Sequence, residues 1–411
     1  MSVAAIHTRT SCRVCASTSL ELLIDYGQMP LAGAFRAAGE SSRGETFPLR
    51  LFRCSSCTLM QILDVVPPEL ILRSSSYASS ATRTLQEHFA AMAPQIVEQS
   101  GSAGKLAVEF GCNDGVLMRP LLAAGAKAVG VDPGDIALQA SLEQGWPLMQ
   151  AYFTESAARQ IASKHGLAQL ITGNNVFAHA DDIHTMVRGV TALLDGEGQF
   201  IFEVHYQGDL IDLVQFDSVY HEHLSYYSLR SLVELLQPYQ LRIAAVKRIS
   251  THSGSIRVTV VRDESTYPTT PSVEEMLQEE RSWDVSGFVS RVALRRAALR
   301  KLVLGLKAGG RRVAAYGAAG RVTILLNYCE LGRDFIDYVV DASPQRVGRN
   351  VPGVDVPILS PACFHETPPD YAIITAWNYE AEIVSKEQAF LSNGGTFIIP
   401  LPEVRLRSGV R

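Results

Sequence analysis

The 411-residue sequence lacks any apolar run of the roughly 20 residues that a helix needs to cross a bilayer. Its first residues, MSVAAIHTRT, lack the apolar core of a secretory signal. It also lacks a basic run, and its net charge of −5 and pI near 6.1 argue against broad contact with nucleic acid or an anionic membrane. We therefore expect a cytoplasmic protein with small partners that is a monomer or a weak dimer. The length predicts two or three domains.

Cysteine is scarce, but four of the seven cysteines form two C-x-x-C pairs separated by 38 residues. These are Cys12, Cys15, Cys54 and Cys57. Such pairs favour metal over disulfides in a reducing compartment. Four thiolates close a tetrahedral zinc site and leave no position for water or substrate. The pattern predicts a structural zinc ion in residues 1–70. A redox role or a nucleic-acid-binding ribbon is disfavoured, because neither pair opens a helix after a buried strand and the flanks carry few basic groups.

The segment between the two pairs, DYGQMPLAGAF at 25–35, contains glycines and a proline. These residues favour an irregular loop that faces a ligand over a core strand.

From about residue 104, short apolar runs alternate with helical stretches, as in a parallel sheet covered by helices. We expect strands at 106–110, 128–132, 168–173 and 198–204. The first is followed by a glycine-rich turn, EFGCNDG at 109–115, and the second ends in Asp132. Glycines let the backbone approach a ligand closely, and a strand-end acid can bind a ribose diol.

The spacing within this turn argues against a dinucleotide site, because the middle glycine of G-x-G-x-x-G is absent. The E-x-G-x-x-x-G turn with its strand-end acid instead resembles the S-adenosylmethionine site of class I methyltransferases. An ordinary strand-to-helix turn is the alternative. The candidate donor-binding residues are Glu109, Gly111, Asn113, Asp114, Gly115, Asp132, Asn174 and Asn175.

Four groups that can hold or move protons follow one another at Tyr220, His221, Glu222 and His223. Burying them without partners would cost several kcal/mol, so they should line a cavity, bind an ion or lie in water. A histidine pKa near 6.5 suits a general base. An extended segment would send Tyr220 and Glu222 to one side and the two histidines to the other. A metal site and a surface loop remain alternatives, although the helical spacing of H-E-x-x-H is absent.

Two further residues are candidates for the same chemistry. His179 follows a strand end of the predicted sheet, which would place it near the methyl donor; a histidine at a helix start or on the surface is the alternative. Tyr77 belongs to the hydroxyl-rich stretch RSSSYASSAT, which could fold over a sugar or phosphate or serve as a flexible linker.

The last part of the chain predicts a second Rossmann-like sheet. Helical character runs from about 272 to 308, and a strand then leads into YGAAGR at 316–321. A second strand, at 336–341, ends in Asp341, and a third is expected at 371–377. Asp341 follows Gly320 by 21 residues, close to the offset of an acid that binds a nicotinamide ribose, so a dehydrogenase stays open. A nucleotide-sugar site would use the same helix start.

Taken together, the order of these motifs resembles the nucleotide-sugar C-methyltransferases that build branched deoxysugars, of the tetronitrose 3-C-methyltransferase type. The likeness covers nearly the whole chain, from the paired cysteines and YGQMPLAGAF to LLNYC and VVDASP. It implies an α/β fold with an N-terminal zinc-binding module (1–70), a central class I methyltransferase domain that binds S-adenosylmethionine (71–265), and a C-terminal Rossmann-like domain (266–411) that contributes to substrate binding.

The resemblance also implies roles. His223 would be the general base, with Tyr220, Glu222 and His179 around it and Tyr77 on the substrate side. The acceptor would be a nucleotide-linked 4-keto-deoxysugar, deprotonated beside its ketone and methylated on that carbon. The implied substrate-binding residues are Tyr77, His221, Tyr316, Gly317, Arg321 and Asp341.

Some positions depart from the family pattern. His205 stands where proline is expected, and Gly320 and Arg321 stand where alanine or lysine followed by glycine is expected. The second strand ends in VDPG in place of EPS, and Asp132 can still accept from a ribose. The other departures leave open the acceptor, its nucleotide and the methylated carbon. The alternatives are an O-methyltransferase or one with a non-sugar acceptor, an NAD-dependent oxidoreductase, and a zinc-anchored protein that binds a nucleotide sugar without catalysis.

Overall fold

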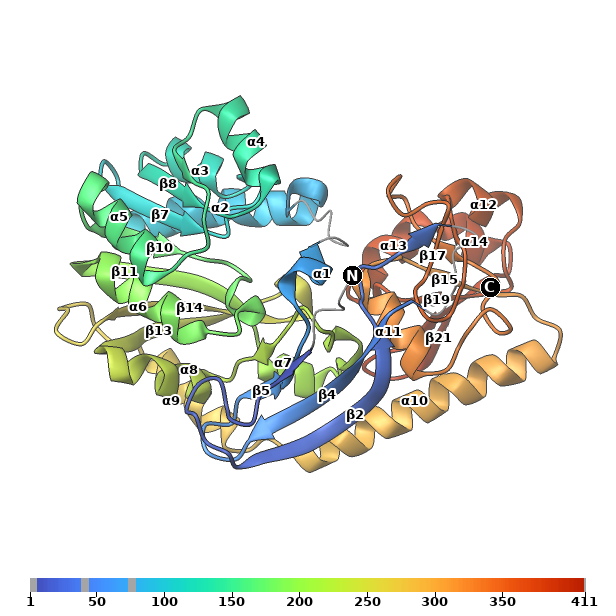
Figure 1. Cartoon of the computed structure of the whole chain (residues 1–411). Helices are drawn as coiled ribbons and strands as arrows, with labels where there is room; N and C mark the ends of the chain where they lie inside the picture. Colours follow the sequence, from blue (N-terminus) through green and yellow to red (C-terminus); the bar gives the residue numbers. More distant parts are fainter. Residues whose placement is uncertain (1–5, 38–43, 73–78, 410–411) are drawn as a thin grey trace.

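The computed structural model describes residues 6–37, 44–72 and 79–409. Tyr77 therefore lies outside the described residues. The three larger sheets are a central one, a C-terminal one, and an N-terminal one that lies below and between them, while the long helix α10 (Val285–Ala308) runs below the C-terminal sheet (Figure 1). Among the helices of the described ranges, none is both long and apolar enough to cross a membrane.

The N-terminal part forms a four-stranded antiparallel sheet in the order β12-β5-β4-β2. Its strands are β2 (Leu20–Pro30), β4 (Thr46–Cys54), β5 (Met60–Ile62) and β12 (Ser225–Tyr226). The expectation of an irregular loop from residue 25 is wrong for 25–30, because these residues complete β2. A bulge at 25–28 explains the misleading composition: the pairing with β4 shifts register there, and Gly27 adopts a φ of 77°. The smaller elements are β1 (His7–Thr8), β3 (Arg36–Ala37), β6 (Asp64–Val65) and α1 (Pro68–Leu72).

The central part is a seven-stranded sheet in the order β13-β14-β11-β10-β7-β8-β9. The five strands from β9 to β11 are parallel, whereas β14 and β13 continue the sheet antiparallel. The strands are β7 (Leu106–Phe110), β8 (Lys127–Val131), β9 (Leu148–Met149), β10 (Ala168–Thr172), β11 (Leu194–His205), β13 (Leu241–Ile249) and β14 (Ser255–Arg262). The four predicted strands of this sheet are confirmed as β7, β8, β10 and β11.

Helices cover both faces of this sheet (Figure 1). They are α2 (Arg83–Ser100), α3 (Met118–Ala123), α4 (Asp135–Gln144), α5 (Glu155–His165), α6 (Ile183–Leu193), α7 (Gln207–Asp212), α8 (Leu229–Leu236) and α9 (Pro271–Glu280). Short 3-10 turns are η1 (Ser79–Ala81), η2 (Phe177–His179), η3 (Phe216–Ser218), η4 (Gln237–Tyr239) and η5 (Thr251–Ser253).

The C-terminal part is a six-stranded sheet in the order β18-β16-β15-β19-β20-β21, with only β21 antiparallel. The strands are β15 (Val313–Tyr316), β16 (Val339–Val340), β18 (Ile358–Leu359), β19 (Tyr371–Ile374), β20 (Thr396–Ile399) and β21 (Arg405–Ser408). The helical elements are α11 (Gly320–Tyr328), α12 (Pro361–Glu366), η6 (Trp377–Tyr379), α13 (Glu380–Lys386) and α14 (Gln388–Ser392). The second Rossmann-like sheet is thereby confirmed.

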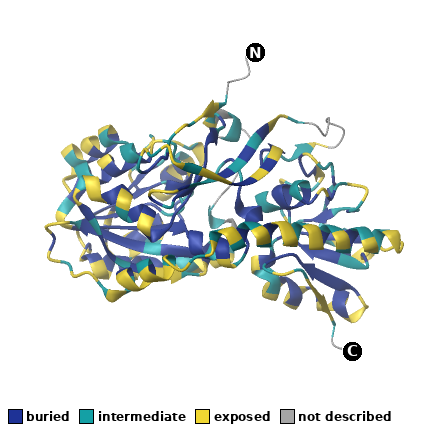
Figure 2. Ribbon diagram, turned by 90° about the horizontal axis from the view of Figure 1, so that it is seen from below, coloured by how far each residue is buried: buried dark blue, intermediate teal, exposed yellow. Residues whose placement is uncertain are grey.

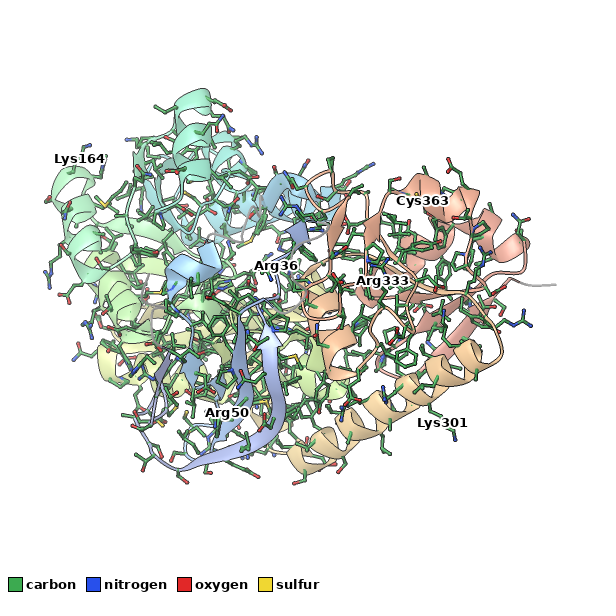
Figure 3. The ribbon with its side chains drawn as sticks, turned by 45° about the vertical axis from the view of Figure 1, so that its right-hand side comes forward. Arg36, Arg50, Lys164, Lys301, Arg333 and Cys363 are labelled. Atoms are coloured by element: carbon green, nitrogen blue, oxygen red, sulfur yellow. The ribbon has the colours of Figure 1, made fainter. Side chains whose placement is uncertain are left out.

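The N-terminal module packs against both α/β units. One core cluster joins strands β2, β4 and β5 to the C-terminal unit, and another joins the cysteine pairs to the central sheet. The sheets are buried, whereas α10 shows a largely exposed face (Figure 2). Strand β3 pairs with β17 (Arg349–Asn350), and Arg36 accordingly lies between the units, while Lys164 and Lys301 project from the outer surface (Figure 3). The domain boundaries at 70 and 265 stay a prediction.

Candidate active site

The glycine-rich turn after β7 lies where the order of the parallel strands reverses, between β7 and β10. Ligands of open α/β sheets bind at this position. Gly111 adopts a φ of 68°, and a Cβ there would lie 2.3 Å from Cγ2 of Val176. Gly115 also has a positive φ of 77°. The turn therefore requires glycine at both positions, in backbone conformations that side chains rarely adopt.

Three buried acceptor oxygens of this region have no hydrogen-bond partner among the residues that the structure describes: Glu109 Oε2, Asp114 Oδ1 and Asn174 Oδ1. Burial, reinforced by Asp132 and Asp114, raises the pKa of Glu109 well above its ordinary value. Buried acceptors without partners are costly, so they suit a ligand that brings donors and positive charge. S-adenosylmethionine, with an ammonium, a sulfonium and a ribose diol, fits these residues.

Asp132 organises the same turn. Its Oδ2 accepts from the backbone N–H of Asn113 at 3.0 Å, and its Oδ1 accepts from Gly134 at 2.8 Å. Each carboxylate oxygen keeps a further lone pair for a ribose hydroxyl. The backbone N–H of Asn175 donates to the carbonyl of Glu203 at 2.8 Å, which fixes the adjoining loop.

The segment before α2, part of the hydroxyl-rich stretch for which the sequence predicts at most a sugar or phosphate contact, lies against this turn. The backbone N–H groups of Ser79 and Ser80 donate to Asn113 Oδ1 at 3.1 Å and to Asp114 Oδ2 at 2.9 Å. Residues 79 and 80 therefore close one side of the predicted donor site.

Tyr220 and His223 lie together because residues 220–223 form a turn, in which the His223 N–H donates to the Tyr220 carbonyl at 2.9 Å. The Tyr220 hydroxyl and His223 Nε2 are 3.0 Å apart. The alternation expected of an extended segment is therefore wrong. His221, 1% exposed, instead packs edge-on against Phe47 of the N-terminal module.

His179 joins this turn from the end of η2. Its Nδ1 lies 2.7 Å from the Glu222 carbonyl oxygen, and its ring centroid lies 5.0 Å from that of His223. Burial lowers the pKa of both histidines, and neighbouring cationic groups lower that of His223 further. Burial also raises the pKa of Glu222 to about 7. The two motifs, distant in sequence, thus form one cluster of neutral imidazoles.

The cluster continues from His223 to Tyr226, whose ring centroids are 6.2 Å apart, and from Tyr226 to His205, whose ring centroids are 6.1 Å apart. His205 Nε2 contacts Gln215 Oε1 at 3.1 Å. Burial lowers the pKa of His205 to about 3, with a smaller contribution from Arg321. From the sequence, His205 is noted only as a departure from the family pattern, and Tyr226 is not among the predicted site residues.

Arg321 reaches this cluster from α11 of the C-terminal unit. Its Nη2 donates to the His252 carbonyl at 3.2 Å and contacts Gln215 Oε1 at 3.5 Å. Its Cζ lies 5.4 Å from the ring centroid of Trp377. Its buried Nη1 has no hydrogen-bond partner among the described residues. These contacts fix the guanidinium and leave the N–H groups of Nη1 available to a ligand.

The other predicted substrate-binding residues of the C-terminal unit make contacts within that unit. The Tyr316 hydroxyl donates to Glu387 Oε1 at 2.7 Å. Asp341 accepts from the backbone N–H groups of Ala318 at 2.7 Å and Ser343 at 2.8 Å. The Gly317 N–H donates to the carbonyl of Val340 at 2.8 Å. These contacts fix the backbone of the second glycine turn against Asp341 of the same unit.

The four paired cysteines converge at one end of the N-terminal sheet, and their sulfur atoms all lie within 4.8 Å of one another. The Sγ atoms of Cys12 and Cys57 are 3.5 Å apart, as are those of Cys15 and Cys54. Tetrahedral zinc with bonds of about 2.3 Å needs sulfurs roughly 3.8 Å apart. Zinc binds thiolates, so the four thiols would release protons on binding the metal. The residues fit a structural zinc ion.

A seven-stranded sheet with this order and an acid-rich glycine turn at the switch point defines a class I methyltransferase that uses S-adenosylmethionine. Family models match three consecutive segments. They are described as "Putative zinc binding domain" (residues 12–71), "Methyltransferase domain" (78–246) and "C-methyltransferase C-terminal domain" (250–402).

The chain is 38% identical to C-methyltransferase NovU of Streptomyces niveus over 405 residues, which cover 97% of this chain and 96% of that protein. The chain therefore belongs to the C-methyltransferase family and is an S-adenosylmethionine-dependent C-methyltransferase with a zinc-binding module. This settles the class of reaction against the oxidoreductase and the noncatalytic alternatives.

More distant likenesses cover less of the chain. The ubiquinone biosynthesis O-methyltransferase of Sodalis glossinidius is 29% identical over 112 residues, 26% of this chain and 44% of that protein. The magnesium protoporphyrin IX methyltransferase of Synechocystis with bound SAH has a TM-score of 0.35 at 20% identity, covering 43% of this chain and 83% of that one. Likenesses of this kind do not bear on the acceptor.

Proposed function

We propose that the acceptor is a nucleotide-linked 4-keto-deoxysugar and that His223 removes the proton from the carbon that is methylated. The observation that carries the proposal is the contact of His223 with Tyr220 and His179 in a partly exposed cluster of a C-methyltransferase. A carbon-bound proton is a very weak acid, but beside a ketone its loss gives an enolate with the charge on oxygen. Methylation of carbon therefore needs a base and a donor to that oxygen.

The contacts of His223 suit a base that acts through Nδ1. This atom is buried and has no hydrogen-bond partner within the described ranges, whereas Nε2 faces the Tyr220 hydroxyl. A neutral ring that donates from Nε2 to Tyr220 keeps the lone pair of Nδ1 free. The lowered pKa keeps the ring neutral at physiological pH.

Tyr220 and His179 lie beside the base. The Tyr220 hydroxyl lies 3.0 Å from His223 Nε2, and we propose that it donates to the enolate oxygen. His179 donates from Nδ1 to the Glu222 carbonyl, so its neutral ring presents Nε2 as a hydrogen-bond acceptor, and we propose that it orients a hydroxyl of the acceptor. Bound S-adenosylmethionine supplies a methyl group activated by its sulfonium. Glu222, and Tyr77 from the segment before α2, are proposed to orient sugar hydroxyls.

The proposed donor-binding set comprises Glu109, Gly111, Asn113, Asp114, Gly115, Asp132, Asn174 and Asn175. On the acceptor side, the free Nη1 of Arg321 suits an anionic oxygen of the nucleotide-linked substrate. His221 packs on the N-terminal module, so we assign it a supporting position next to the catalytic turn.

Replacing the base tests the proposal. We expect His223→Ala to lower kcat by about 10²–10⁴-fold and to leave the affinity for S-adenosylmethionine unchanged, because the donor site lies on another turn. Deuterium washout from the carbon beside the ketone of the candidate sugar nucleotide should slow equally. His365→Ala, at an exposed position of the C-terminal unit, is the matched control. Wild-type washout in His223→Ala would remove this residue as the base.

A further inference from the structure

An arginine inside the zinc-binding turn connects that turn to the catalytic cluster. Arg13 stands between Cys12 and Cys15, and its side chain is 0% exposed. A guanidinium buried this completely is unfavourable unless its donors are paired with acceptors of fixed position. Burial lowers the pKa of Arg13, and Asp181 opposes this shift.

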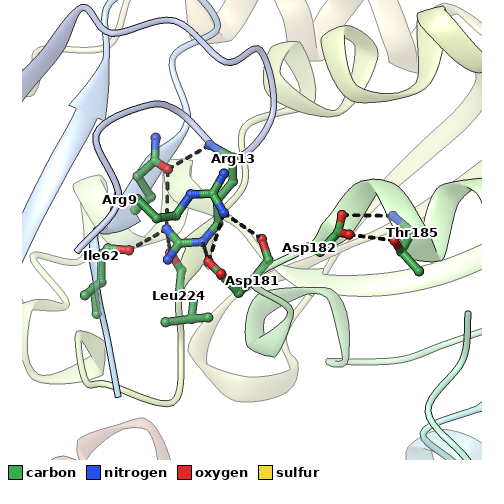
Figure 4. A network of polar contacts seen from close by, with 8 residues as sticks. Arg9, Arg13, Ile62, Asp181, Asp182, Thr185 and Leu224 are labelled. Atoms are coloured by element: carbon green, nitrogen blue, oxygen red, sulfur yellow. Dashed lines mark hydrogen bonds and ion pairs between the residues drawn. The ribbon is translucent and has the colours of Figure 1, made fainter. Parts of the chain in front are cut away.

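The partners of Arg13 belong to three separate segments (Figure 4). Nε donates to Asp181 Oδ1 at 3.0 Å. Nη1 donates to the carbonyl of Ile62 on β5 and lies 3.4 Å from the carbonyl of Leu224. Its backbone N–H donates to Gln61 Oε1 at 3.1 Å.

Two of these partners adjoin the proposed catalytic histidines. Leu224 directly follows His223, and Asp181 follows His179 by two residues. The two segments also bond to each other, because the Leu224 N–H donates to the Ala178 carbonyl at 2.7 Å and the Ile62 N–H donates to the Leu224 carbonyl at 3.0 Å. A shift of Arg13 would thus move both histidines.

We propose that Arg13 is a positioning residue through which the zinc-binding turn sets the distance between His179 and His223. The inference rests on the proposed function, which gives these two histidines their catalytic importance. Zinc fixes the conformation of residues 12–15, and the forked guanidinium transmits that conformation to both catalytic segments. The zinc module then contributes to catalysis without any contact with substrate.

Arg13→Met keeps much of the apolar stem and removes the fork. We expect the variant to retain one zinc ion per chain and to bind S-adenosylmethionine within twofold of wild type. The NMR signal of the His179 Nδ1 proton in ¹⁵N-histidine-labelled protein should shift or broaden, because its contact with Glu222 loosens. Amide exchange in peptides 176–182 and 219–227 should accelerate about tenfold, while peptide 105–116 stays unchanged.

Arg9→Met is the matched control. Arg9 pairs with the same Asp181 oxygen at 3.2 Å but makes no described side-chain contact with Leu224 or Ile62. It should leave exchange in 219–227 at the wild-type rate. Should Arg13→Met fail to fold, Asp181→Asn removes the other side of the ion pair and should produce a smaller change of the same kind.

A chelation experiment on the wild-type protein tests the effect of the zinc ion itself. Removing zinc should change the His179 signal as Arg13→Met does, and adding zinc should restore it. An unchanged His179 signal in zinc-loaded Arg13→Met, or in the zinc-free chain, would overturn the inference, as would loss of zinc from Arg13→Met. These readouts need no acceptor, so a failure of His223 as base would be detected separately by the washout experiment.

Discussion

The central and C-terminal α/β units share one local structure at the end of their second strand and use it differently. Asp132 accepts from a backbone N–H of the glycine turn and from the N–H two residues after itself. Asp341 makes the same two contacts in the C-terminal unit. The strand orders also correspond, β9-β8-β7-β10-β11 in one and β18-β16-β15-β19-β20 in the other.

The difference lies in what surrounds each aspartate. In the part of the chain that the structure describes, the central turn leaves buried acceptors of Glu109, Asp114 and Asn174 without partners. In the C-terminal unit, Asp341 also contacts Arg346 at 3.4 Å, and the turn is covered by Thr375, whose hydroxyl donates to the carbonyl of Tyr316 at 2.9 Å. We therefore propose that the same fold binds the methyl donor in the central unit and positions Arg321 beside the neighbouring site in the C-terminal unit.

The largest effect should come from Glu109→Gln, which leaves the fold of the turn but removes a carboxylate facing a cationic ligand. We expect the affinity for S-adenosylmethionine, measured by calorimetry, to fall about 10- to 100-fold. Asp341→Asn makes the equivalent change of charge in the C-terminal turn and should leave the affinity within twofold. Equal losses in the two variants would contradict the assignment of different tasks to the two turns.

Donor binding should also release a proton. Burial raises the pKa of Glu109, so the free protein holds that carboxyl protonated over a wider pH range. A cationic donor favours the carboxylate, and the proton leaves on binding. The binding enthalpy should therefore depend on the ionisation enthalpy of the buffer in wild type and lose that dependence in Glu109→Gln.

A smaller effect is expected for Arg321→Met, which removes the side chain that the C-terminal unit contributes. The KM of the candidate sugar nucleotide should rise about tenfold with unchanged donor affinity, because one charge-assisted hydrogen bond is lost. The acid limb of kcat/KM should move to higher pH, since Arg321 lowers the pKa of His223. Arg346→Met, which removes a cation paired with Asp341, should change neither quantity. A KM increase in both variants would point to general loosening of the unit.

Local patterns were sufficient to predict the central parallel strands of both α/β sheets, both glycine turns and the paired cysteines, because each depends on neighbours in sequence. Bulges and turns whose conformation depends on pairing with strands distant in sequence were not predictable from local patterns. Residues 25–30 form a strand because β4 pairs with them, despite Gly27. The 220–223 turn precedes β12, whose partner β5 lies in the N-terminal module.

The titratable and charged side chains around His223 were only partly predicted, for the same reason. His205, His252 and Arg321 come from β11, η5 and α11, and only their packing makes them neighbours. Their sequence surroundings carry no shared periodicity. A departure from the family pattern at His205 and Arg321 was the available signal, and it pointed to the acceptor side of the site.

The last effect concerns stability in acid and again distinguishes the two units. Burial lowers the pKa of His221 to about 4 and that of His205 to about 3, both from 6.5 in the unfolded chain. Below pH 6.5 the unfolded chain therefore binds more protons, and each histidine lowers the free energy of unfolding by at most about 1.4 kcal/mol per pH unit until its folded pKa is reached. The C-terminal unit, residues 266–411, contains one histidine, His365, whose side chain is 51% exposed, so this unit has no buried histidine.

Amide exchange between pH 6.5 and 4.5 should consequently show the catalytic region opening before the C-terminal sheet. His221→Phe, which can pack on Phe47, should reduce the pH dependence by one histidine's contribution. His365→Phe should leave it unaltered. If both units instead open together at every pH, the core that each shares with the N-terminal module couples them into one cooperative folding unit. The two units would then differ in function but not in stability.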